Sequence, residues 1–288
     1  MKVLSFNVPK IKREAFRYQE DSGPHFYDQL HQHPEIQIML ILQGEGTLIA
    51  GDYVGRFAAG NLYVIGSGQP HVFRSDKNYY HKKSKLKAKA VSLYFNEKYW
   101  GDSFWQLDEM KLVRKFSVRA MHGLQVNGKV KNEIAEGIHQ LKNVQGIDKL
   151  ILFLSMLKRL CEAKGTKPLA VSALGSNFNP EEGKRMNSIL SFTFRESHRK
   201  IYIGEAAGIA NLSTEAFCRY FKLHTQKTYT LFLNELRVSN ACQMLMNKDW
   251  SIQDVCYQSG FNNISNFNRI FKRVTGKSPS NYLKLNRQ

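Results

Sequence analysis

Apolar residues change their spacing along this chain at about residue 95. Before that point they occur in short runs separated by glycine-containing segments. The runs occupy residues 36–42, 47–50, 53–57, 61–65, 71–73 and 90–95, with Gly44, Gly46, Gly51, Gly60, Gly66 and Gly68 between them. Short strands at regular spacing with turn signals are typical of an all-β barrel or sandwich. We therefore predict a β-barrel over about residues 20–96.

After residue 95 the spacing becomes helical. Residues 97–116 have a mixed, partly helical pattern, and residues 129–144 and 147–163 are predicted to be helices. Apolar side chains of the last helix recur at helical spacing (Leu150, Leu154, Leu157 and Cys161), and the stripe is widened by Ile151, Phe153 and Leu160. Such a helix can pair with its copy in a homodimer or close over the barrel, and the sequence leaves both uses open.

Residues 165–180 contain glycine, proline and serine without a helical period, which is typical of a linker. The segment Asn179-Pro180-Glu181-Glu182 then has the N-cap, the first-turn proline and the acidic residues that begin a helix. We predict an N-terminal domain over residues 1–165 (helices to residue 164), a linker over 166–180 and an all-helical domain over 181–288. The fold class is α+β with two domains.

The helical domain contains an internal repeat. Residues 203–233 resemble residues 251–283 when Arg219 is placed on Arg269, Phe221 on Phe271 and Lys222 on Lys272. Each copy has two short helices around a turn residue that tolerates a left-handed backbone, Asn211 in the first copy and Gly260 in the second. We predict helix-turn-helix motifs over about 203–224 and 251–275, joined by a helix over about 230–247 that is about 27 Å long.

The second helix of each copy has an apolar face and a polar face. In the second copy the polar row is Ser265, Asn268, Arg269 and Lys272; in the first it is Glu215, Cys218, Arg219 and Lys222. Arginine and asparagine can read guanine and adenine in a major groove, and lysine and helix N-termini can hold phosphate. Two ordinary hairpins with solvated faces are the alternative, which the kept register disfavours. The predicted DNA-contacting residues are Ser213, Thr214, Glu215, Cys218, Arg219, Lys222, Asn262, Asn263, Ser265, Asn268, Arg269 and Lys272.

The charge of the chain agrees with a polyanionic partner but does not locate it. The 288 residues have a net charge of +18, which is common in nucleic-acid-binding proteins. Both halves contribute, because 26 basic and 16 acidic residues give +10 over 1–175 and 16 against 8 give +8 over 176–288. A lysine run (Lys82, Lys83, Lys85, Lys87 and Lys89) is interpreted as a solvated loop or a protected sheet edge, with a second anion-binding surface as the alternative.

The sequence gives little support for a zinc-finger protein, a membrane or secreted protein, or an enzyme. The cysteines (Cys161, Cys218, Cys242 and Cys256) have no zinc-finger spacing, and we expect reduced, mostly buried thiols. No apolar run is long enough for a membrane span and no secretory signal is evident, so we expect a cytoplasmic protein without membrane contact. No Ser/His/Asp, P-loop or paired-carboxylate arrangement indicates an enzyme.

Residues 183–287 resemble the DNA-binding domain of the AraC/XylS family of bacterial transcription regulators. The matching residues of the second motif and of the connecting helix are Ile252, Val255, Cys256, Gly260, Phe261, Phe267, Arg269, Phe271, Lys272, Gly276, Pro279, Tyr282, Arg237, Ala241 and Leu245. The resemblance implies a bipartite site on double-stranded DNA and contacts with RNA polymerase. The chain departs from the family at Asn211, at Gln226 opposite Gly276, and at Glu215, whose carboxylate repels phosphate; the first copy is therefore predicted to be the weaker or more selective reader.

Residues 31–73 resemble the cupin-type sensor barrel of the same family. Cupin enzymes hold a metal with two histidines, a carboxylate and a later histidine, and the matching positions here are His31, His33, Gln37 and His71. Because a neutral amide replaces the carboxylate, we expect an effector pocket with no metal or other cofactor; if a metal binds, its ligands are His31, His33 and His71. Structural histidines are a third interpretation. His25, His81, His122 and His139 are expected at the surface.

The function predicted from these features is a sequence-specific transcription regulator that a small-molecule effector controls from the N-terminal barrel. Two alternatives remain. One is a metal-dependent cupin enzyme fused to a DNA-binding domain, and the other is a regulator without an effector.

Overall fold

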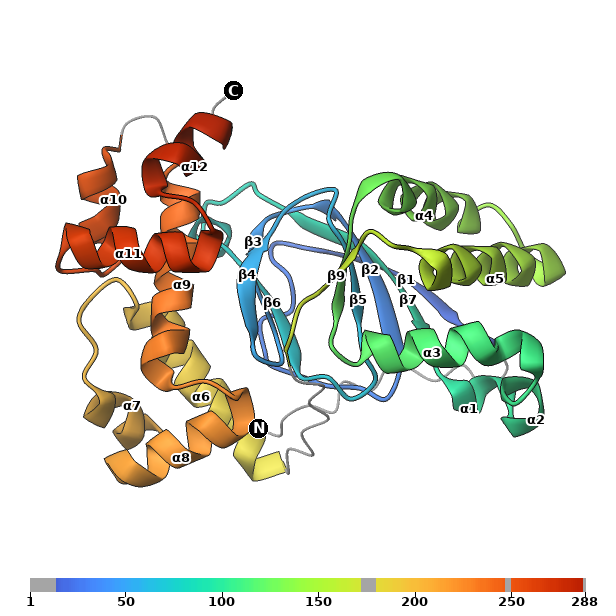
Figure 1. Cartoon of the computed structure of the whole chain (residues 1–288), viewed down its shortest axis with the longest axis horizontal. Helices are drawn as coiled ribbons and strands as arrows, with labels where there is room; N and C mark the ends of the chain where they lie inside the picture. The colour runs from blue at the N-terminus through green and yellow to red at the C-terminus, as the bar shows by residue number, and fades with distance from the viewer. Residues whose placement is uncertain (1–13, 172–179, 247–249, 287–288) are drawn as a thin grey trace. The chain divides into compact units, whose positions relative to one another are not determined.

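The computed structural model describes residues 14–171, 180–246 and 250–286. They form two compact units, one before and one after residues 172–179 (Figure 1). The first unit combines two β-sheets with helices, and the second is entirely helical. The α+β fold class with two domains is confirmed. Among the described residues, none of the helices combines the length and the apolar character that a membrane span needs.

The sheets of the first unit contain strands at every predicted position and three that were not predicted. The six-stranded sheet has the order β1 (Arg17–Gly23), β7 (Ala88–Phe95), β2 (Ile36–Gln43), β5 (Leu62–Ile65), β8 (Leu124–Val126) and β9 (Thr166–Pro168). The three-stranded sheet has the order β4 (Tyr53–Phe57), β3 (Gly46–Ala50) and β6 (His71–Ser75). Neighbouring strands pair antiparallel throughout both described sheets.

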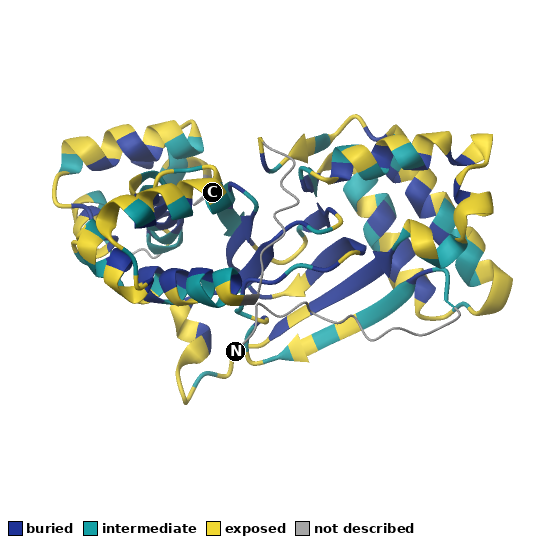
Figure 2. Cartoon of the chain, turned by 90° about the horizontal axis from the view of Figure 1, so that it is seen from below, coloured by how far each residue is buried: buried dark blue, intermediate teal, exposed yellow. Residues whose placement is uncertain are grey.

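Strand alternation divides the core of this unit into two parts. On β2, Ile36, Ile38 and Leu40 belong to the cluster under the helices, whereas Met39 and Ile41 belong to the cluster between the two sheets. Successive side chains of a strand point to opposite faces, so Gln37 shares the inner face with Met39. Figure 2 shows the resulting mixture of buried strands and half-exposed helices. The sequence pattern thus directs a polar side chain into the space between the sheets.

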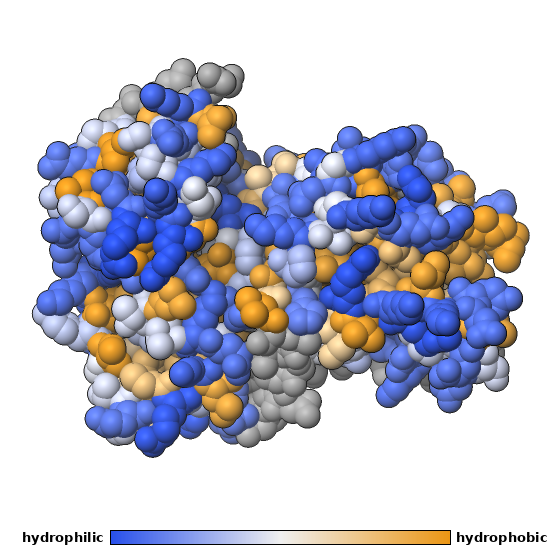
Figure 3. Space-filling view, in the orientation of Figure 1, coloured by the Kyte–Doolittle hydropathy of each residue, from blue (hydrophilic) through white to orange (hydrophobic). Residues whose placement is uncertain are grey.

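Helices cover the outer face of the large sheet. They are α1 (Glu97–Trp100), α2 (Asp102–Trp105), α3 (Lys111–Ala120), α4 (Gly128–Leu141) and α5 (Gly146–Glu162), with a short 3-10 turn η2 (Asp108–Met110) before α3. A second 3-10 turn, η1 (Lys77–Tyr80), connects β6 and β7. Helix α5 buries Phe153, Leu157 and Leu160 in the core beneath it, but Ile147 and Ile151 are 66% and 54% exposed. Orange apolar atoms accordingly lie among hydrophilic ones over this part of the surface (Figure 3). Closure over the sheet is one use of α5, and pairing with a second copy remains a prediction.

The predicted linker over residues 166–180 is wrong in its first part. Residues Thr166–Pro168 form β9, which pairs with β8, and Ala170 is 2% exposed. A three-residue edge strand has no periodic pattern, and the glycine and proline around it gave the opposite signal. Residues 172–179, including the predicted N-cap Asn179, lie outside the described residues, and α6 begins at Pro180 as expected.

The helical unit contains seven described helices. They are α6 (Pro180–Glu196), α7 (Ile203–Ile209), α8 (Thr214–Thr225), α9 (Tyr229–Met244), α10 (Ile252–Gln258), α11 (Ile264–Thr275) and α12 (Pro279–Asn286). Helices α7 and α8 form one helix-turn-helix pair and α10 and α11 the other, with α9 between them. Helix α9 has 16 residues, so it is about 24 Å long rather than the predicted ~27 Å. Its buried face joins the core of the second motif through Val238, Ala241 and Cys242, and Leu245, which follows the helix, belongs to the same core.

Candidate nucleic-acid interface and effector cavity

Helices α8 and α11 are fixed at their starts by the same device. The Ser213 hydroxyl accepts the Ala216 N–H at 3.2 Å, and the Asn263 amide oxygen accepts the Asn266 N–H at 2.9 Å. These side chains satisfy N–H groups that have no partner inside the helix. Phe217 and Phe221 in α8, like Phe267 and Phe271 in α11, are fully buried. Each helix is thus held rigidly by one face while the other face meets solvent.

The exposed faces carry the side chains that were predicted to contact DNA. All twelve predicted residues are exposed: Ser213, Thr214, Glu215, Cys218, Arg219, Lys222, Asn262, Asn263, Ser265, Asn268, Arg269 and Lys272. Their exposure agrees with a reading surface, while their contact with DNA remains a prediction. The exposed Cys218 departs from the expectation of mostly buried thiols, since Cys242 and Cys256 are buried and Cys161 is half-buried.

The two faces differ in charge. Helix α8 carries Glu215, Arg219 and Lys222, a net charge of +1, whereas α11 carries three basic residues and no acidic one, a net charge of +3. Hydrogen bonds from its own N–H and from the Ser213 hydroxyl, together with the charge of Arg219, lower the pKa of Glu215. The carboxylate is therefore ionised and held at the start of α8, where it reduces the attraction of this helix for phosphate.

Two exposed residues of α11, Asn266 and Arg273, were not among the predicted residues. Arg269 Nη2 donates to Asn266 Oδ1 at 2.8 Å, which orients the guanidinium along the helix. Arg273, one turn beyond Arg269, is exposed. The i, i+3 and i, i+4 spacings to Arg269 are visible in the sequence and are the signal that could have identified both residues.

The turn positions have the backbone that the sequence predicts. Asn211 has φ 54° and Gly260 has φ 93°, so both lie in the left-handed region. The chain leaves α8 at Gln226 with φ 54° and α11 at Gly276 with φ 76°. The first copy therefore uses a side-chain-bearing residue at both positions where the second uses glycine. The backbone strain is about 1–2 kcal/mol at Gln226 and smaller at Asn211, because asparagine tolerates the left-handed region.

A hydrogen-bonded segment between α6 and α7 fixes the two motifs to each other. Arg237 of α9 donates to the carbonyl oxygens of Ser197 at 2.9 Å and of Arg199 at 2.6 Å. A Cβ on Gly260 would lie 2.1 Å from the same Ser197 oxygen. The turn of the second motif thus packs against the segment that leads into the first, and only glycine leaves room for that contact.

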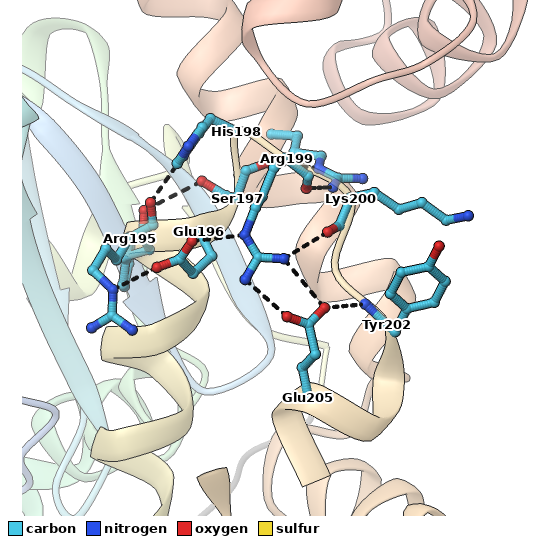
Figure 4. Close-up of polar contacts among 10 residues, drawn as sticks. Arg195, Glu196, Ser197, His198, Arg199, Lys200, Tyr202 and Glu205 are labelled. Carbon is cyan, nitrogen blue, oxygen red and sulfur yellow. Dashed lines mark hydrogen bonds and ion pairs between the residues drawn. The ribbon is translucent and has the colours of Figure 1, made fainter. Parts of the chain in front are cut away.

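Ion pairs stabilise this segment from its other side (Figure 4). Arg199 donates to Glu196 at 2.8 Å and to both carboxylate oxygens of Glu205 at 3.2 and 2.9 Å. Hydrogen bonds from Arg195 and Arg199 lower the pKa of Glu196 to about 2. Glu205 also accepts the Tyr202 N–H at 2.9 Å, which caps α7.

The first unit (residues 14–171, the sensor unit from here on) contains a cavity of about 370 Å³. Three of the four predicted effector-pocket residues line it (His31, Gln37 and His71), and His33 lies behind them with its ring centroid 5.1 Å from that of His71. The remaining lining is mostly aromatic or apolar: Phe26, Tyr27, Met39, Phe73, Ala88 and Tyr94. Asp21, Ser22, Gly23 and His25 complete it. An apolar hollow with a few converging polar groups is typical of a small-molecule site.

Several of these cavity residues were not predicted. His25 was expected at the surface, but it lines the cavity and stacks on Tyr80 at 4.4 Å between ring centroids. Isolated histidines carry no periodic signal, so the sequence could not place it. His122 is half-buried, whereas His81 and His139 are exposed as expected.

The three histidines of the cluster are buried and oriented by backbone carbonyls. One ligand-capable nitrogen from each of His31, His33 and His71 lies within 4.8 Å of the others. Burial lowers the pKa of His31 to about 4 and that of His33 below its usual value. Burial and the two neighbouring rings hold the pKa of His71 well below its usual value. All three imidazoles are therefore neutral near pH 7.

Gln37 and Glu35 surround the cluster with further polar groups. The Gln37 amide nitrogen donates to Ser92 Oγ at 3.0 Å and to the Tyr94 hydroxyl at 3.1 Å. Glu35 is 2% exposed and accepts the Tyr99 hydroxyl at 2.5 Å. Gln37 was predicted in the pocket from the resemblance to the cupin site. Glu35, which lies just before strand β2, was considered there as well, but its spacing made it the weaker candidate.

Comparisons with known proteins found relatives for both units of the chain. The family model of the AraC-like ligand binding domain matches residues 15–144, and the family model of a helix-turn-helix domain matches residues 206–285. The chain is 22% identical to the transcriptional activator RhaR of Mannheimia succiniciproducens over 88% of this chain and 86% of that protein. It is 28% identical to the transcriptional regulator YdeC of Bacillus subtilis, but that match spans only 42% of either chain.

Among solved structures, the DNA-binding domain of AdpA in complex with a target DNA is 25% identical, with a TM-score of 0.33, over 34% of this chain and 89% of that one. The two matched domains, in this order along the chain, define a DNA-binding transcription regulator with a ligand-binding domain. The chain belongs to the AraC/XylS family of such regulators.

Proposed function

We propose that this chain reads two adjacent major-groove segments of a bacterial promoter with α8 and α11, under the control of a small effector in the sensor cavity. The observation that carries the proposal is the duplication of one capped, half-buried helix with its polar row exposed in both copies. Adjacent major-groove segments on one side of B-DNA are ~34 Å apart, and α9 extends about 24 Å between the motifs.

The two helices are proposed to contribute unequally. Helix α11 has a net charge of +3 and offers Asn268 and Arg269 to base edges, as adenine and guanine recognition require. Helix α8 has a net charge of +1 and an ionised carboxylate at its start. A carboxylate can accept only from cytosine among the major-groove donors, so Glu215 makes the first half-site more selective and less tightly bound.

Mapping of binding sites in the cell, followed by footprinting of the strongest site, tests the DNA-binding half of the proposal. The expected footprint covers two segments about one helical turn apart. Lys222→Ala and Lys272→Ala should weaken binding to all sequences, because lysine contacts phosphate, while Lys115→Ala, at an exposed position of α3, is the control. A uniform footprint that ignores sequence would contradict the proposal.

The sensor cavity is proposed to hold the effector because its volume and lining are those of a small-molecule site. A bound compound at 100 times its Kd should stabilise the folded chain by about 2.7 kcal/mol, which thermal-shift screening detects. Ala88 is buried and lines the cavity, so Ala88→Phe should abolish the shift, whereas Val171→Phe, at an 86% exposed position, should retain it. Equal shifts in both variants would place the effector elsewhere.

Assembly and partners follow from the family as further proposals. We place the regulator in the cytoplasm as a homodimer that contacts RNA polymerase at its promoters. The exposed Ile147 and Ile151 of α5 are the surface we assign to dimerisation. Sedimentation of Ile151→Asp against the unsubstituted chain tests this assignment, since a buried charge at the interface should yield monomers.

A further inference from the structure

The cavity of the sensor unit has an acidic side chain in its lining but no strongly basic one. Among the described residues that line it, Asp21 is the only aspartate or glutamate, and none is a lysine or an arginine. Asp21 lies opposite Ala90 in the pairing of β1 with β7, and Ala90 belongs to the cluster between the two sheets. Because paired residues of neighbouring strands share a face, the Asp21 carboxylate lies on the inner face of the sheet.

The Asp21 carboxylate has a neutral partner and lacks a cationic one in the described part of the chain. Gln19 Nε2 donates to Asp21 Oδ1 at 2.7 Å, and Arg17 Nε donates to Gln19 Oε1 at 3.2 Å rather than to Asp21. Burial raises the pKa of Tyr94, another lining residue, and the nearby charge of Asp21 raises it further. The negative charge of Asp21 is therefore available to a molecule in the cavity.

The neutral polar groups of the lining have used their donors within the protein. Nδ1 of His31 and of His71 lies 2.9 and 2.8 Å from a backbone carbonyl oxygen. A carbonyl oxygen only accepts, so in these neutral rings Nδ1 carries the proton and Nε2 has the lone pair. The Gln37 amide nitrogen donates to Ser92 Oγ and to the Tyr94 hydroxyl. A ligand that needs donors from this wall would find few.

One acceptor of the wall lacks a donor. His71 lines the cavity and is 1% exposed, and its Nε2 has no hydrogen-bond partner among the described residues. An unsatisfied buried polar atom is costly, and an N–H or O–H of a ligand in the cavity would satisfy it. The lining thus favours a ligand that donates hydrogen bonds over one that accepts them.

Aromatic side chains supply much of the remaining lining. They are Phe26, Tyr27, Phe73 and Tyr94, and the ring centroids of Phe26 and Phe73 lie 6.5 Å apart. The negative face of an aromatic ring attracts an organic cation. The cavity volume of about 370 Å³ is more than twice the roughly 150 Å³ that holds a benzene molecule, so an aromatic ring with a short side chain fits.

We propose that the effector is an organic cation, an amine on an aromatic body, whose ammonium group pairs with Asp21 while a second donor of the ligand bonds to His71 Nε2. This inference rests on the proposed effector function of the same cavity. An ammonium group offers three donors and no acceptor. A carboxylate ligand would instead meet the charge of Asp21 and the lone pair of His71 with no lysine or arginine in the described lining to offset them.

Titration calorimetry of the full chain with a matched series of head groups tests the charge of the effector. The amines are tyramine and tryptamine, the alcohols are tyrosol and tryptophol, and the carboxylates are 3-(4-hydroxyphenyl)propionate and indole-3-propionate. We expect each amine to bind about 10-fold or more tightly than its alcohol, and the carboxylates not to bind. Phenethylamine, which lacks the phenol donor, should bind more weakly than tyramine. Tighter binding of an alcohol or a carboxylate, or no binding of either amine, would overturn the proposal.

Variants locate the ammonium group. Asp21→Asn should weaken tyramine about 10-fold or more and leave tyrosol unchanged, and Asp102→Asn, at an exposed position of α2, should change neither. Equal tyramine affinity in Asp21→Asn would overturn the pairing. The head-group series uses the unsubstituted chain, so it decides the charge of the effector even if Asp21→Asn does not fold. An alcohol or carboxylate that stabilises the unsubstituted chain but not Ala88→Phe would overturn the cationic class and keep the effector site, whereas tyramine binding retained in Ala88→Phe would overturn both.

Discussion

Gly260 is the residue at which a single added methyl group should do the most damage to the DNA-binding unit. Its φ of 93° lies in the left-handed region, and a Cβ would meet the Ser197 carbonyl oxygen at 2.1 Å and Arg237 Nε at 2.8 Å. Both atoms belong to the hydrogen bond that connects α9 to the segment before α7. Gly260→Ala must therefore displace backbone as well as adopt a strained conformation.

The cost can be estimated from these two effects. Left-handed backbone costs an alanine about 1–2 kcal/mol, and loss of a hydrogen bond to a charged group costs about 1.5–3 kcal/mol. We expect Gly260→Ala to destabilise the helical unit by the sum of the two effects, about 2.5–5 kcal/mol. Gly276→Ala isolates the backbone effect, because Gly276 has φ 76° but nothing within 4 Å of its Cβ position, and should cost only about 1–2 kcal/mol.

Hydrogen exchange followed by peptide mass spectrometry measures this destabilisation in the whole chain, because it reports the opening of α10 and α11 separately from that of the sensor unit. Gly204→Ala is a matched control at a helical glycine with nothing within 4 Å, and it should stabilise α7 by about 0.5–1 kcal/mol. If Gly260→Ala opened α11 no more than Gly276→Ala does, the contact with Ser197 would not be the reason for glycine at this turn.

Three further predictions concern the first motif and its ion pairs. Gln226→Gly should raise the free energy of unfolding of the helical unit by about 1 kcal/mol, seen as a higher melting temperature; an unchanged or lower value would contradict the strain assigned to φ 54°. Glu215→Gln should tighten binding to DNA of any sequence and relax discrimination in one half-site, measured by titration against matched and altered sites; unchanged affinity would show that the carboxylate does not approach DNA. Because Arg195 and Arg199 lower the pKa of Glu196 to about 2, its folded-state pKa lies below the unfolded value. The stability that it contributes is present above about pH 4.5 and is lost as the pH falls towards 2; Glu196→Gln should flatten this part of the profile of unfolding against pH, and an identical profile would refute the linkage.

The repeat and the strand positions could be predicted because their signals are local. Capping by Ser213 and Asn263, the buried phenylalanines and the left-handed Asn211 and Gly260 all follow from residue type and spacing. The inner-facing Gln37 follows from alternation along β2. Each of these features depends on a few neighbouring residues, so sequence alone determines it.

Features that depend on distant pairing could not be predicted. Strand β1 has the polar sequence RYQEDSG and exists because it pairs along β7, some seventy residues later. Strand β9 depends on β8 in the same way. The contact between Gly260 and Ser197 and the approach of Glu35 to Tyr99 are also long-range. The contribution of these pairings and contacts to stability can be judged only when the residues that pack against them in the folded chain are known.

Selection of binding sites from random DNA with the unsubstituted chain, Arg219→Ala and Arg269→Ala tests the central claim most directly. The account predicts a two-part motif with half-sites about one helical turn apart. Each arginine variant should lose discrimination in a different half, at about 1–3 kcal/mol for the affected base pair, and Lys115→Ala, at an exposed position of α3, should select the original motif. Selection of one undivided motif, or of the same two-part motif by both arginine variants, would contradict the assignment of α8 and α11 as the two reading helices.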